Sequence, residues 1–378
     1  FIMVTKAPIL PTSVVGSYAT PSWLITAIQE MDKGNYGETD INETFNDAVK
    51  VAISDQEQAG IDIISDGEMR RWHFVQSFYK KMTGIEREPD LRKIGVYGYD
   101  SPARYKAVSK IEVPEGLGII EEFDYLKTQT NLPVKMTCPG PLTLTIHVRP
   151  GNIYKNRIDM AWELADVINQ ELKSLVEKGA TFIQIDEPSF AIIPGEMDDW
   201  IDLYNATVKG VNAKLALHVC FGNLGSRPRG KRQYEWMFPK LLDANAEQLV
   251  LEYANREMIE ADLWSKYDIP NELGAGVVDI KSFHVETPED VAERIRILLK
   301  HTDPEKMSIN PDCGFFQLPR WLAYKKLQAL VAGTLSITTC KLLTRSLSRF
   351  KAISLEACLA ALSVKTPFTS NASSYSLF

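Results

Sequence analysis

A histidine and a cysteine stand two positions apart in the apolar segment LALHVCFGN (215–223). Side chains at this spacing on a strand point to the same face, so His218 and Cys220 can direct ligand atoms to one point. Glu252 and Cys313 end later strand-like segments, on the same side of the expected fold. Two thiolates, an imidazole and a carboxylate suit Zn²⁺. We therefore predict a zinc site, although the HVC pair alone also fits a buried histidine beside an inert cysteine.

Zinc in such a ligand set has two competing uses. It lowers the pKa of a coordinated thiol far below its free value of about 8.5, so that a substrate thiol binds as a nucleophilic thiolate. It also activates water for hydrolysis. Two thiolates and a carboxylate make the set anionic, which weakens the Lewis acidity of the metal and leaves a bound sulfur electron-rich. The ligand set therefore favours alkyl transfer to sulfur.

Eight strand-like segments alternate with helical patterns along the chain. The segments are short and apolar in near-continuous runs, as in strands that are buried on both faces. They lie at 12–18, 61–68, 133–140, 181–188, 215–223, 248–254, 272–280 and 307–314. The clearest helical patterns lie at 42–60, 157–179, 287–301 and 318–333. Eight βα repeats predict an α/β fold of the TIM (β/α)8 barrel type, with a doubly wound sheet as the alternative.

Polar residues end nearly every one of these strand-like segments. In a TIM barrel, the active site lies at the carboxyl ends of the strands. The residues at these ends include Val15, Gly16, Ser17, Glu68, Asp186, His218, Cys220, Glu252, Asp279, Asp312 and Cys313. We therefore expect a single polar rim to carry the reaction.

Composition and charge argue against several classes of function. Hydrophobic residues make up 45% of the 378 positions, enough for a substantial core. The net charge of −7, with no concentrated basic patch, argues against a nucleic-acid partner. The chain has no apolar run of about 18 residues and its first residues lack the order of a signal peptide, so we expect neither a membrane span nor export. A cytoplasmic protein is expected, with its five cysteines as thiols.

The sequence predicts one catalytic domain and an atypical tail. Residues 1–334 are assigned to the barrel, with an insertion at 84–130 between the second helix and the third strand. This insertion is expected to form a hairpin or lid near the mouth of the barrel. Residues 335–378 are rich in Ser, Thr and Leu; an apolar helix is expected at 350–364 and partial disorder at the end.

The motifs of the chain resemble those of the C-terminal catalytic barrel of cobalamin-independent methionine synthase. The resemblance runs from about residue 10 to residue 333. The motifs that match are LPTSVVGSY, SDGE, CPGPLT, IQIDEP, HVC, the Glu of LEYA, GVVDI and NPDCGF. As a set, these motifs are highly specific. Full-length synthases have an additional N-terminal barrel, so the resemblance is to a single-barrel core form.

The resemblance implies roles for particular residues. It implies that Zn²⁺ is held by His218, Cys220, Glu252 and Cys313. It implies that homocysteine is contacted by Val15, Gly16, Ser17, Glu68 and Asp186. Two of these contacts are carboxylates suited to an ammonium group.

Two positions depart from the pattern of the resembled family. His147 follows the GPLT motif where full-length enzymes have a tryptophan that stacks on folate, so we expect it to line the substrate site as a smaller, more polar platform. Lys281 follows VVDI where the family has a histidine that assists proton transfer, and we take Asp279 and Lys281 as the candidate catalytic residues. These departures leave two candidate methyl donors, methyltetrahydrofolate and a methylcorrinoid protein.

Three functions are compatible with the sequence. The first is zinc-dependent methyl transfer to homocysteine, which gives methionine. The second is alkyl transfer to another small thiol, as in the related epoxyalkane:coenzyme M transferase. Two acids in the thiol pocket would repel the sulfonate of coenzyme M, although Arg70 and Arg71 lie close to Glu68 in the sequence. The third is a non-catalytic barrel, stabilised by zinc, that binds a corrinoid partner.

Overall fold

The computed structural model describes residues 8–89, 103–223 and 232–349, with side chains in the last helix described as far as residue 339. The chain divides into two compact units, residues 1–334 and residues 335–378. All the residues with predicted roles lie in the first unit.

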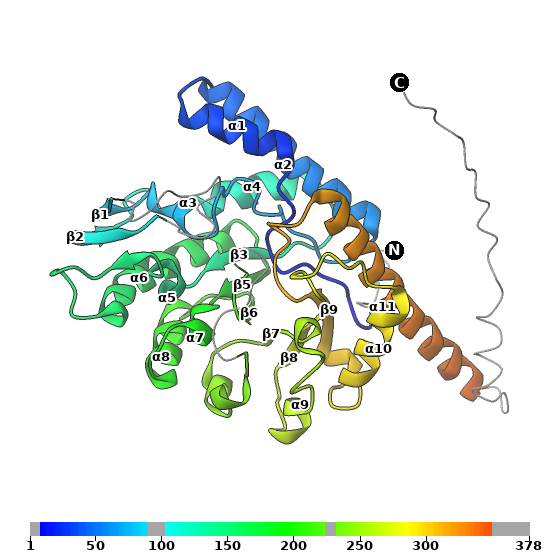
Figure 1. Ribbon diagram of the computed structural model, residues 1–378. Coiled ribbons are helices and arrows are strands. Elements are labelled where there is room, and N and C mark those ends of the chain that lie inside the picture. Colours follow the sequence, from blue (N-terminus) through cyan, green and yellow to red (C-terminus); the bar gives the residue numbers. More distant parts are fainter. Residues whose placement is uncertain (1–7, 90–102, 224–231, 350–378) are drawn as a thin grey trace, which may run out of the picture. The chain divides into compact units, whose positions relative to one another are not determined.

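A six-stranded parallel sheet forms the centre of the first unit (Figure 1). Its strands, in spatial order, are β3 (Met136–Pro139), β5 (Phe182–Asp186), β6 (Lys214–Val219), β7 (Gln248–Glu252), β8 (Glu272–Val278) and β9 (Met307–Pro311). Nearly every residue of these strands is buried, which explains why they read as continuous apolar runs. The predicted α/β class with a parallel sheet is confirmed.

The segments predicted as the first two strands, 12–18 and 61–68, form isolated parallel bridges rather than ladders. The bridges pair Thr12 with Ile309, Ser13 with Ile63, and Ile64 with Val134. Side chains take some of the backbone donors that a ladder would use. Thr12 N–H donates to Asp62 Oδ2 at 2.8 Å, and Asp62 N–H donates to Thr12 Oγ1 at 3.0 Å. This reciprocal pair satisfies both N–H groups through side-chain oxygens instead of the backbone oxygens of a ladder.

Helices lie on the outside of the parallel sheet (Figure 1). The longer ones are α1 (Ser22–Asp32), α2 (Glu38–Ala59), α4 (Ile119–Gln129), α6 (Arg157–Glu177), α8 (Met197–Thr207), α10 (Pro288–Leu298) and α11 (Arg320–Arg349). Single turns are α3 (Gln76–Tyr79), α5 (Pro141–Leu144), α7 (Ser189–Ile192), α9 (Leu263–Lys266), η1 (Glu235–Met237), η2 (Lys240–Asp243), η3 (Ala254–Arg256) and η4 (Pro304–Lys306). The four predicted helices correspond to α2, α6, α10 and α11.

Local sequence signals set the ends of two of these helices. α10 begins with a capping box, in which Asp290 N–H donates to Thr287 Oγ1 at 3.2 Å and Thr287 N–H donates to Asp290 Oδ2 at 2.8 Å. α2 ends at Gly60, whose φ of +87° favours glycine.

α11 does not end where the sequence predicted. The predicted helical pattern ends at residue 333, but the helix continues to Arg349. A Cβ atom on Gly333 would lie 2.6 Å from the Cβ of Val291 and 2.7 Å from the backbone oxygen of Pro288. This glycine therefore allows α11 to pack closely against α10. The helix predicted at 350–364 lies outside the described residues.

The predicted insertion, residues 84–130, contributes to a second, three-stranded sheet. β1 (Thr83–Arg87) pairs antiparallel with β2 (Tyr105–Glu112), and β2 pairs in parallel with β4 (Val148–Arg149). Tyr105 N–H also donates to the backbone oxygen of His147 at 2.9 Å. The second sheet is thereby joined to the segment that carries a predicted substrate contact.

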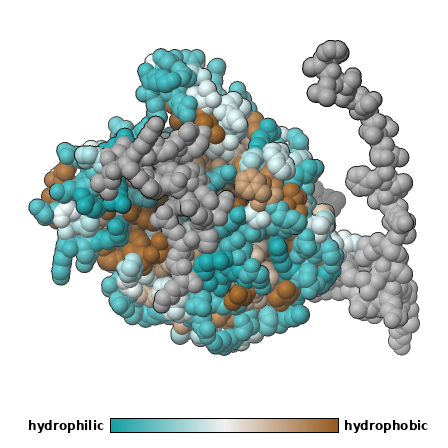
Figure 2. Space-filling model, viewed as in Figure 1, coloured by the Kyte–Doolittle hydropathy of each residue, from teal (hydrophilic) through white to brown (hydrophobic). Residues whose placement is uncertain are grey.

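The described helices include none that is both long enough and apolar enough to cross a membrane. Figure 2 shows hydrophilic residues over much of one face, with the hydrophobic residues in separate patches. Apolar side chains of the central strands, such as those of Ile183, Leu217 and Leu249, are fully buried.

Candidate metal centre

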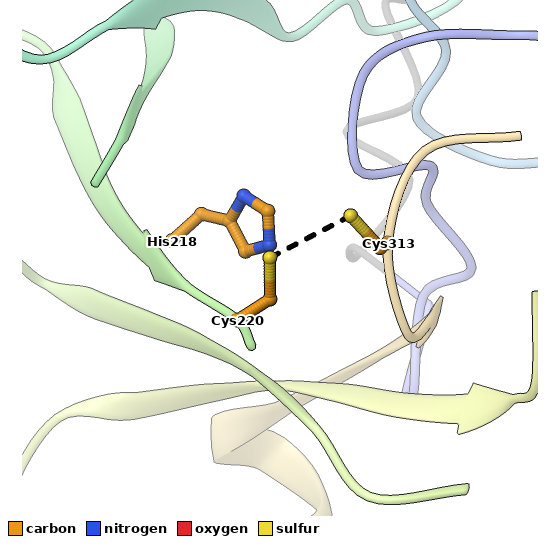
Figure 3. Close-up of side chains that lie close together, drawn as sticks. All are labelled: His218, Cys220 and Cys313. Carbon is orange, nitrogen blue, oxygen red and sulfur yellow. Dashed lines mark hydrogen bonds between the residues drawn. The ribbon is translucent and has the colours of Figure 1, made fainter. Parts of the chain in front are cut away.

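Three of the four predicted zinc ligands lie together at the carboxyl ends of the strands. His218 lies on β6, Cys220 directly follows this strand, and Cys313 follows β9. One ligand atom from each residue lies within 4.8 Å of the other two, and the two Sγ atoms are 3.6 Å apart. Figure 3 shows the imidazole and both thiols pointing toward one another. Ligand-type atoms from β6, inside the sheet order, and from the loop after β9, at one end of it, therefore converge at one point.

Glu252, the fourth predicted ligand, ends β7 and lies outside this group of three. Its Oε2 atom accepts from the Lys281 ammonium at 2.6 Å and from Phe221 N–H at 3.3 Å. Its Oε1 atom is buried and has no hydrogen-bond partner among the described residues. Because an unpaired buried carboxylate oxygen is costly, Oε1 is the atom of Glu252 that a further ligand would satisfy.

The two thiols and the imidazole differ in their readiness to ionise. The hydrogen bond from Cys220 holds the pKa of Cys313 well below its usual value, and the same contact, with burial, raises the pKa of Cys220. Burial alone would lower the pKa of His218, but the Asp186 carboxylate, 2.7 Å from Nδ1, and the nearby Cys313 raise it to about 9. The group therefore already favours one thiolate, the form in which cysteine binds metal.

The donor atoms of this group fit Zn²⁺. Two sulfur atoms bound to a tetrahedral zinc ion at about 2.3 Å lie about 3.8 Å apart. The observed separation of 3.6 Å is close to this value. His218 Nε2, like Glu252 Oε1, is buried without a hydrogen-bond partner among the described residues. Thiolate and imidazole donors select zinc over hard cations such as Mg²⁺.

A pocket opens beside the three predicted ligands and is lined by all the predicted substrate contacts. These contacts are Val15, Gly16, Ser17, Glu68, Asp186 and His147, and they share the lining with His218, Cys220 and Cys313. The pocket therefore brings an imidazole, two thiols and two carboxylates into one space.

Glu68 reaches this pocket from a tight turn. Its φ is +55°, and its N–H donates to Asp66 Oδ1 at 3.0 Å, which stabilises the turn. Its Oε1 atom accepts from Thr137 Oγ1 at 2.6 Å and from Arg71 at 3.1 Å. Burial raises the pKa of Glu68 to about 7, against the opposing effect of Arg71. A strained backbone and a perturbed carboxylate are both typical of functional sites.

The remaining predicted residues have different surroundings. The ring centroid of His147 lies 5.6 Å from that of His73, edge-on, and both residues line the pocket. Asp279 and Lys281 are not part of this lining. Asp279 accepts from the Asn255 side chain at 3.1 Å and from Lys281 N–H at 2.8 Å. The structure thus places Lys281 against a predicted metal ligand, and Asp279 against η3, the turn that follows β7.

Arg71 supports the pocket but was not assigned a role from the sequence. Its guanidinium donates to Glu122 at 2.6 Å, to Glu68 at 3.1 Å and to the Thr137 backbone oxygen at 2.8 Å. Its position three residues after Glu68 is a sequence signal for the contact between these two residues. Its other partner, Glu122, lies 51 positions away in the sequence. Such a partner could not be identified from spacing alone.

Glu187 is a second residue that the sequence did not single out. Its carboxylate accepts from the backbone N–H groups of Leu142 and Thr143, each at 3.0 Å, and so satisfies the start of α5. A Cβ atom on Gly140 would lie 2.1 Å from Glu187 Oε1. The glycine of CPGP and the glutamate of IDEP therefore belong to one close contact between neighbouring strand ends.

Comparison with known proteins assigns the chain to a family. The sequence profile described as "Cobalamin-independent synthase, Catalytic domain" matches residues 10–334. The chain belongs to the cobalamin-independent methionine synthase family. The family predicted from the motifs is confirmed. Among relatives in this family, a protein of Sulfurisphaera tokodaii named methionine synthase is 37% identical over 330 residues, covering 87% of this chain and 93% of the relative.

Further members of the cobalamin-independent methionine synthase family agree in sequence and in structure. The methionine synthase of Saccharolobus solfataricus is 38% identical over 333 residues, covering 87% of this chain and 95% of the relative. A solved B12-independent methionine synthase from Shewanella, in complex with selenomethionine, superposes with a TM-score of 0.75 at 30% identity. The superposition covers 89% of this chain and 99% of the Shewanella chain.

Proposed function

We propose that this chain is a zinc-dependent methyltransferase, which moves a methyl group to the thiol of homocysteine and releases methionine. The observation that carries this proposal is the shared pocket, in which His218, Cys220 and Cys313 adjoin the carboxylates of Glu68 and Asp186. The relatives named methionine synthase match over nearly their whole length, which supports the same assignment.

Each end of homocysteine has a complementary group in this pocket. Glu68 and Asp186 offer carboxylates for the ammonium group. The Ser17 hydroxyl and the backbone beside Gly16 can hold the substrate carboxylate. With both ends held, the thiol is directed toward His218, Cys220 and Cys313, as close positioning of reacting atoms requires.

The residues present would hold one zinc ion through the sulfurs of Cys220 and Cys313, Nε2 of His218 and Oε1 of Glu252. When bound, zinc favours the thiolate form of a substrate thiol at neutral pH. The pocket residues orient this sulfur toward the methyl carbon of the donor. The new sulfur–carbon bond forms as the bond between carbon and donor breaks, and the electron pair of that bond stays on the donor.

We place the methyl donor beside His73 and His147, whose rings line the same pocket. A planar pterin can stack on an imidazole, which suits methyltetrahydrofolate. The family and its solved relative are named as independent of cobalamin or B12, which gives no support to a methylcorrinoid protein. We therefore rank folate first and compare both donors in the test.

We also propose that the parallel sheet closes into the predicted eight-stranded TIM barrel. The bridges at Thr12 and Ser13 connect β9 to Ile63, and the bridge from Ile64 to Val134 leads on to β3. Eight segments in this order form a ring, and closure would remove the free edges of the sheet.

Alkyl transfer to coenzyme M is the second candidate, and the pocket argues against it. A sulfonate would meet the carboxylates of Glu68 and Asp186. Arg71 is already engaged by Glu122, Glu68 and Thr137, and the Arg70 side chain donates to Asn46. The third candidate, a structural zinc site, disagrees with ligands that open into a pocket, because structural sites are closed.

The test is methyl transfer by the zinc-loaded chain, with homocysteine and each donor in turn. Methionine formation with either donor supports the proposal, whereas no methionine from both donors overturns it. Cys313→Ser is expected to abolish the reaction, and Cys138→Ser, a change at a buried cysteine outside the pocket lining, is expected to leave it intact. Binding of coenzyme M without binding of homocysteine would decide for the second candidate.

A further inference from the structure

A buried line of hydrogen bonds leads from His218 into the interior of the sheet. Nδ1 of His218 lies 2.7 Å from Oδ1 of Asp186, and the same oxygen accepts from Nε2 of Gln184 at 2.7 Å. Oε1 of Gln184 accepts from Nζ of Lys135 at 2.7 Å. All four side chains are buried, and neither Gln184 nor Lys135 lines the pocket. This line therefore runs from two residues of the pocket, His218 and Asp186, to two residues behind them that do not line it.

The pairing of the strands brings these residues into register. Asp186 pairs with His218 across β5 and β6, and Gln184 stands two positions earlier on the same face of β5. Lys135 directly precedes β3, whose residue Thr137 pairs with Gln184. The line is thus built on neighbouring strands of the central sheet, not on loops.

Two independent contacts determine which way the Gln184 amide points. Its Nε2 donates to the backbone oxygen of Val15 at 2.7 Å, and a carbonyl oxygen can only accept. Its Oε1 accepts from Lys135, whose ammonium has donors only. Burial lowers the pKa of Lys135 to about 7, but the ammonium and the neutral amine can both donate to this oxygen. Gln184 therefore presents an N–H group to Asp186.

A carboxylate can only accept hydrogen bonds, so when Asp186 is a carboxylate, Nδ1 of His218 is the donor in their short contact. In the neutral ring, the lone pair then lies on Nε2, which is buried without a partner among the described residues. Figure 3 shows a ring nitrogen of His218 beside the sulfur of Cys220. We propose that Gln184 and Lys135 are positioning residues, which hold Asp186 so that Nε2 of His218 is presented to zinc. This inference rests on the zinc site of the proposed function.

The test compares the zinc affinity of the full chain with that of three variants, by competition with a chelator. Gln184→Met removes the donor to Asp186, and Lys135→Met removes one of the two contacts that fix the direction of the Gln184 amide. Gln184→Glu keeps an acceptor for Lys135 but offers Asp186 no donor. This variant replaces Gln184→Met in the comparison if Gln184→Met fails to fold. Loss of such a partner behind a metal ligand typically costs about 10-fold to 100-fold in affinity, and we expect this loss for both Gln184 variants.

Gln248→Met is the matched control. Gln248 is a buried glutamine on β7, which is separated from β5 by β6, and its Nε2 donates to Ser308 Oγ at 3.1 Å. It has no bond to Asp186 or His218 among the contacts of the described residues. Gln248→Met measures the effect of removing a buried amide without breaking the hydrogen bonds between Lys135 and His218. We expect this variant to bind zinc with wild-type affinity.

A second readout follows the Nδ1 proton of His218 in the zinc-loaded protein. The chain has five histidines, so nitrogen-15 labelling of histidine gives few signals. We expect slow exchange of this proton in the wild type and in Gln248→Met, and at least 10-fold faster exchange in Gln184→Met. A purely structural role for Gln184 would lower stability without changing this exchange rate.

The outcomes separate this inference from the proposed function. Weaker zinc binding and faster proton exchange in the Gln184 variants, but not in Gln248→Met, would support the positioning role. Wild-type affinity and wild-type exchange in a folded Gln184 variant would overturn it, and so would an equal loss in Gln248→Met. If the wild-type chain itself bound no zinc, the proposed function would fail, and the inference with it.

Discussion

The ammonium of Lys281 lies 2.6 Å from Oε2 of Glu252, and both side chains are almost completely buried. Burial alone would lower the pKa of Lys281, but Glu252 and Cys313 raise it above its usual value. Lys281 therefore keeps its proton near neutral pH. The arrangement favours a role as counter-charge to Glu252, a predicted metal ligand, over a role in proton transfer.

Lys281→Met is expected to destabilise the zinc-free protein by about 3–5 kcal/mol, because it leaves the Glu252 carboxylate buried without a cation. With zinc bound, the loss is expected to be smaller, because the metal supplies positive charge at the same carboxylate. Denaturant unfolding of both forms measures the difference.

Lys326→Met is the matched control for this change. Lys326 forms a similarly buried pair with Glu286, at 2.8 Å, and neither residue lines the pocket. Its loss is expected to cost the same with and without zinc. Equal costs for Lys281→Met in the two forms would show that its partner is not a metal ligand.

Lys135 is expected to make stability depend on pH. Burial lowers its pKa from 10.5 to about 7, so between these values the unfolded chain binds a proton that the folded chain does not. The stability that this residue contributes is complete above the unfolded pKa and is lost as pH falls through about 7. From pH 7 to pH 9, the free energy of unfolding should rise by up to about 1.4 kcal/mol per pH unit relative to Lys135→Met. If the free energy of unfolding changed with pH in the same way in the wild type and in Lys135→Met, this prediction would be wrong.

Glu68→Gln is expected to weaken homocysteine binding about 10-fold to 100-fold, because it removes a charge-assisted hydrogen bond to the ammonium group. Calorimetric titration of the zinc-loaded protein measures the effect. The matched ligand is 4-mercaptobutanoate, which is homocysteine without its amino group, and its affinity should not change. A similar loss for both ligands would mean that Glu68 acts through the shape of the pocket instead of through charge.

The convergence of His218, Cys220 and Cys313 could be anticipated from the sequence for a physical reason. Parallel strands present their carboxyl ends at the same edge of a sheet, so chemistry-bearing residues at those ends must meet. The two-residue spacing of His218 and Cys220 then places both side chains on one face. Residue type, strand position and spacing were sufficient, with no knowledge of distances.

The partners of these residues could not be anticipated in the same way. The pairing of Glu252 with Lys281 and of Arg71 with Glu122 depends on side-chain directions over long sequence separations. Gly333 shows a related difficulty, because a glycine that ends a helix and a glycine that permits close packing look alike in a sequence. The first two strands were overestimated because the Thr12–Asp62 contact satisfies backbone donors without a ladder.

X-ray absorption at the zinc edge of the purified, zinc-loaded chain tests the central claim most directly. We expect one zinc ion per chain with two sulfur ligands at about 2.3 Å and two nitrogen or oxygen ligands, and a third sulfur when homocysteine is added. A protein that retains no zinc, or a zinc shell of nitrogen and oxygen only, would contradict the account.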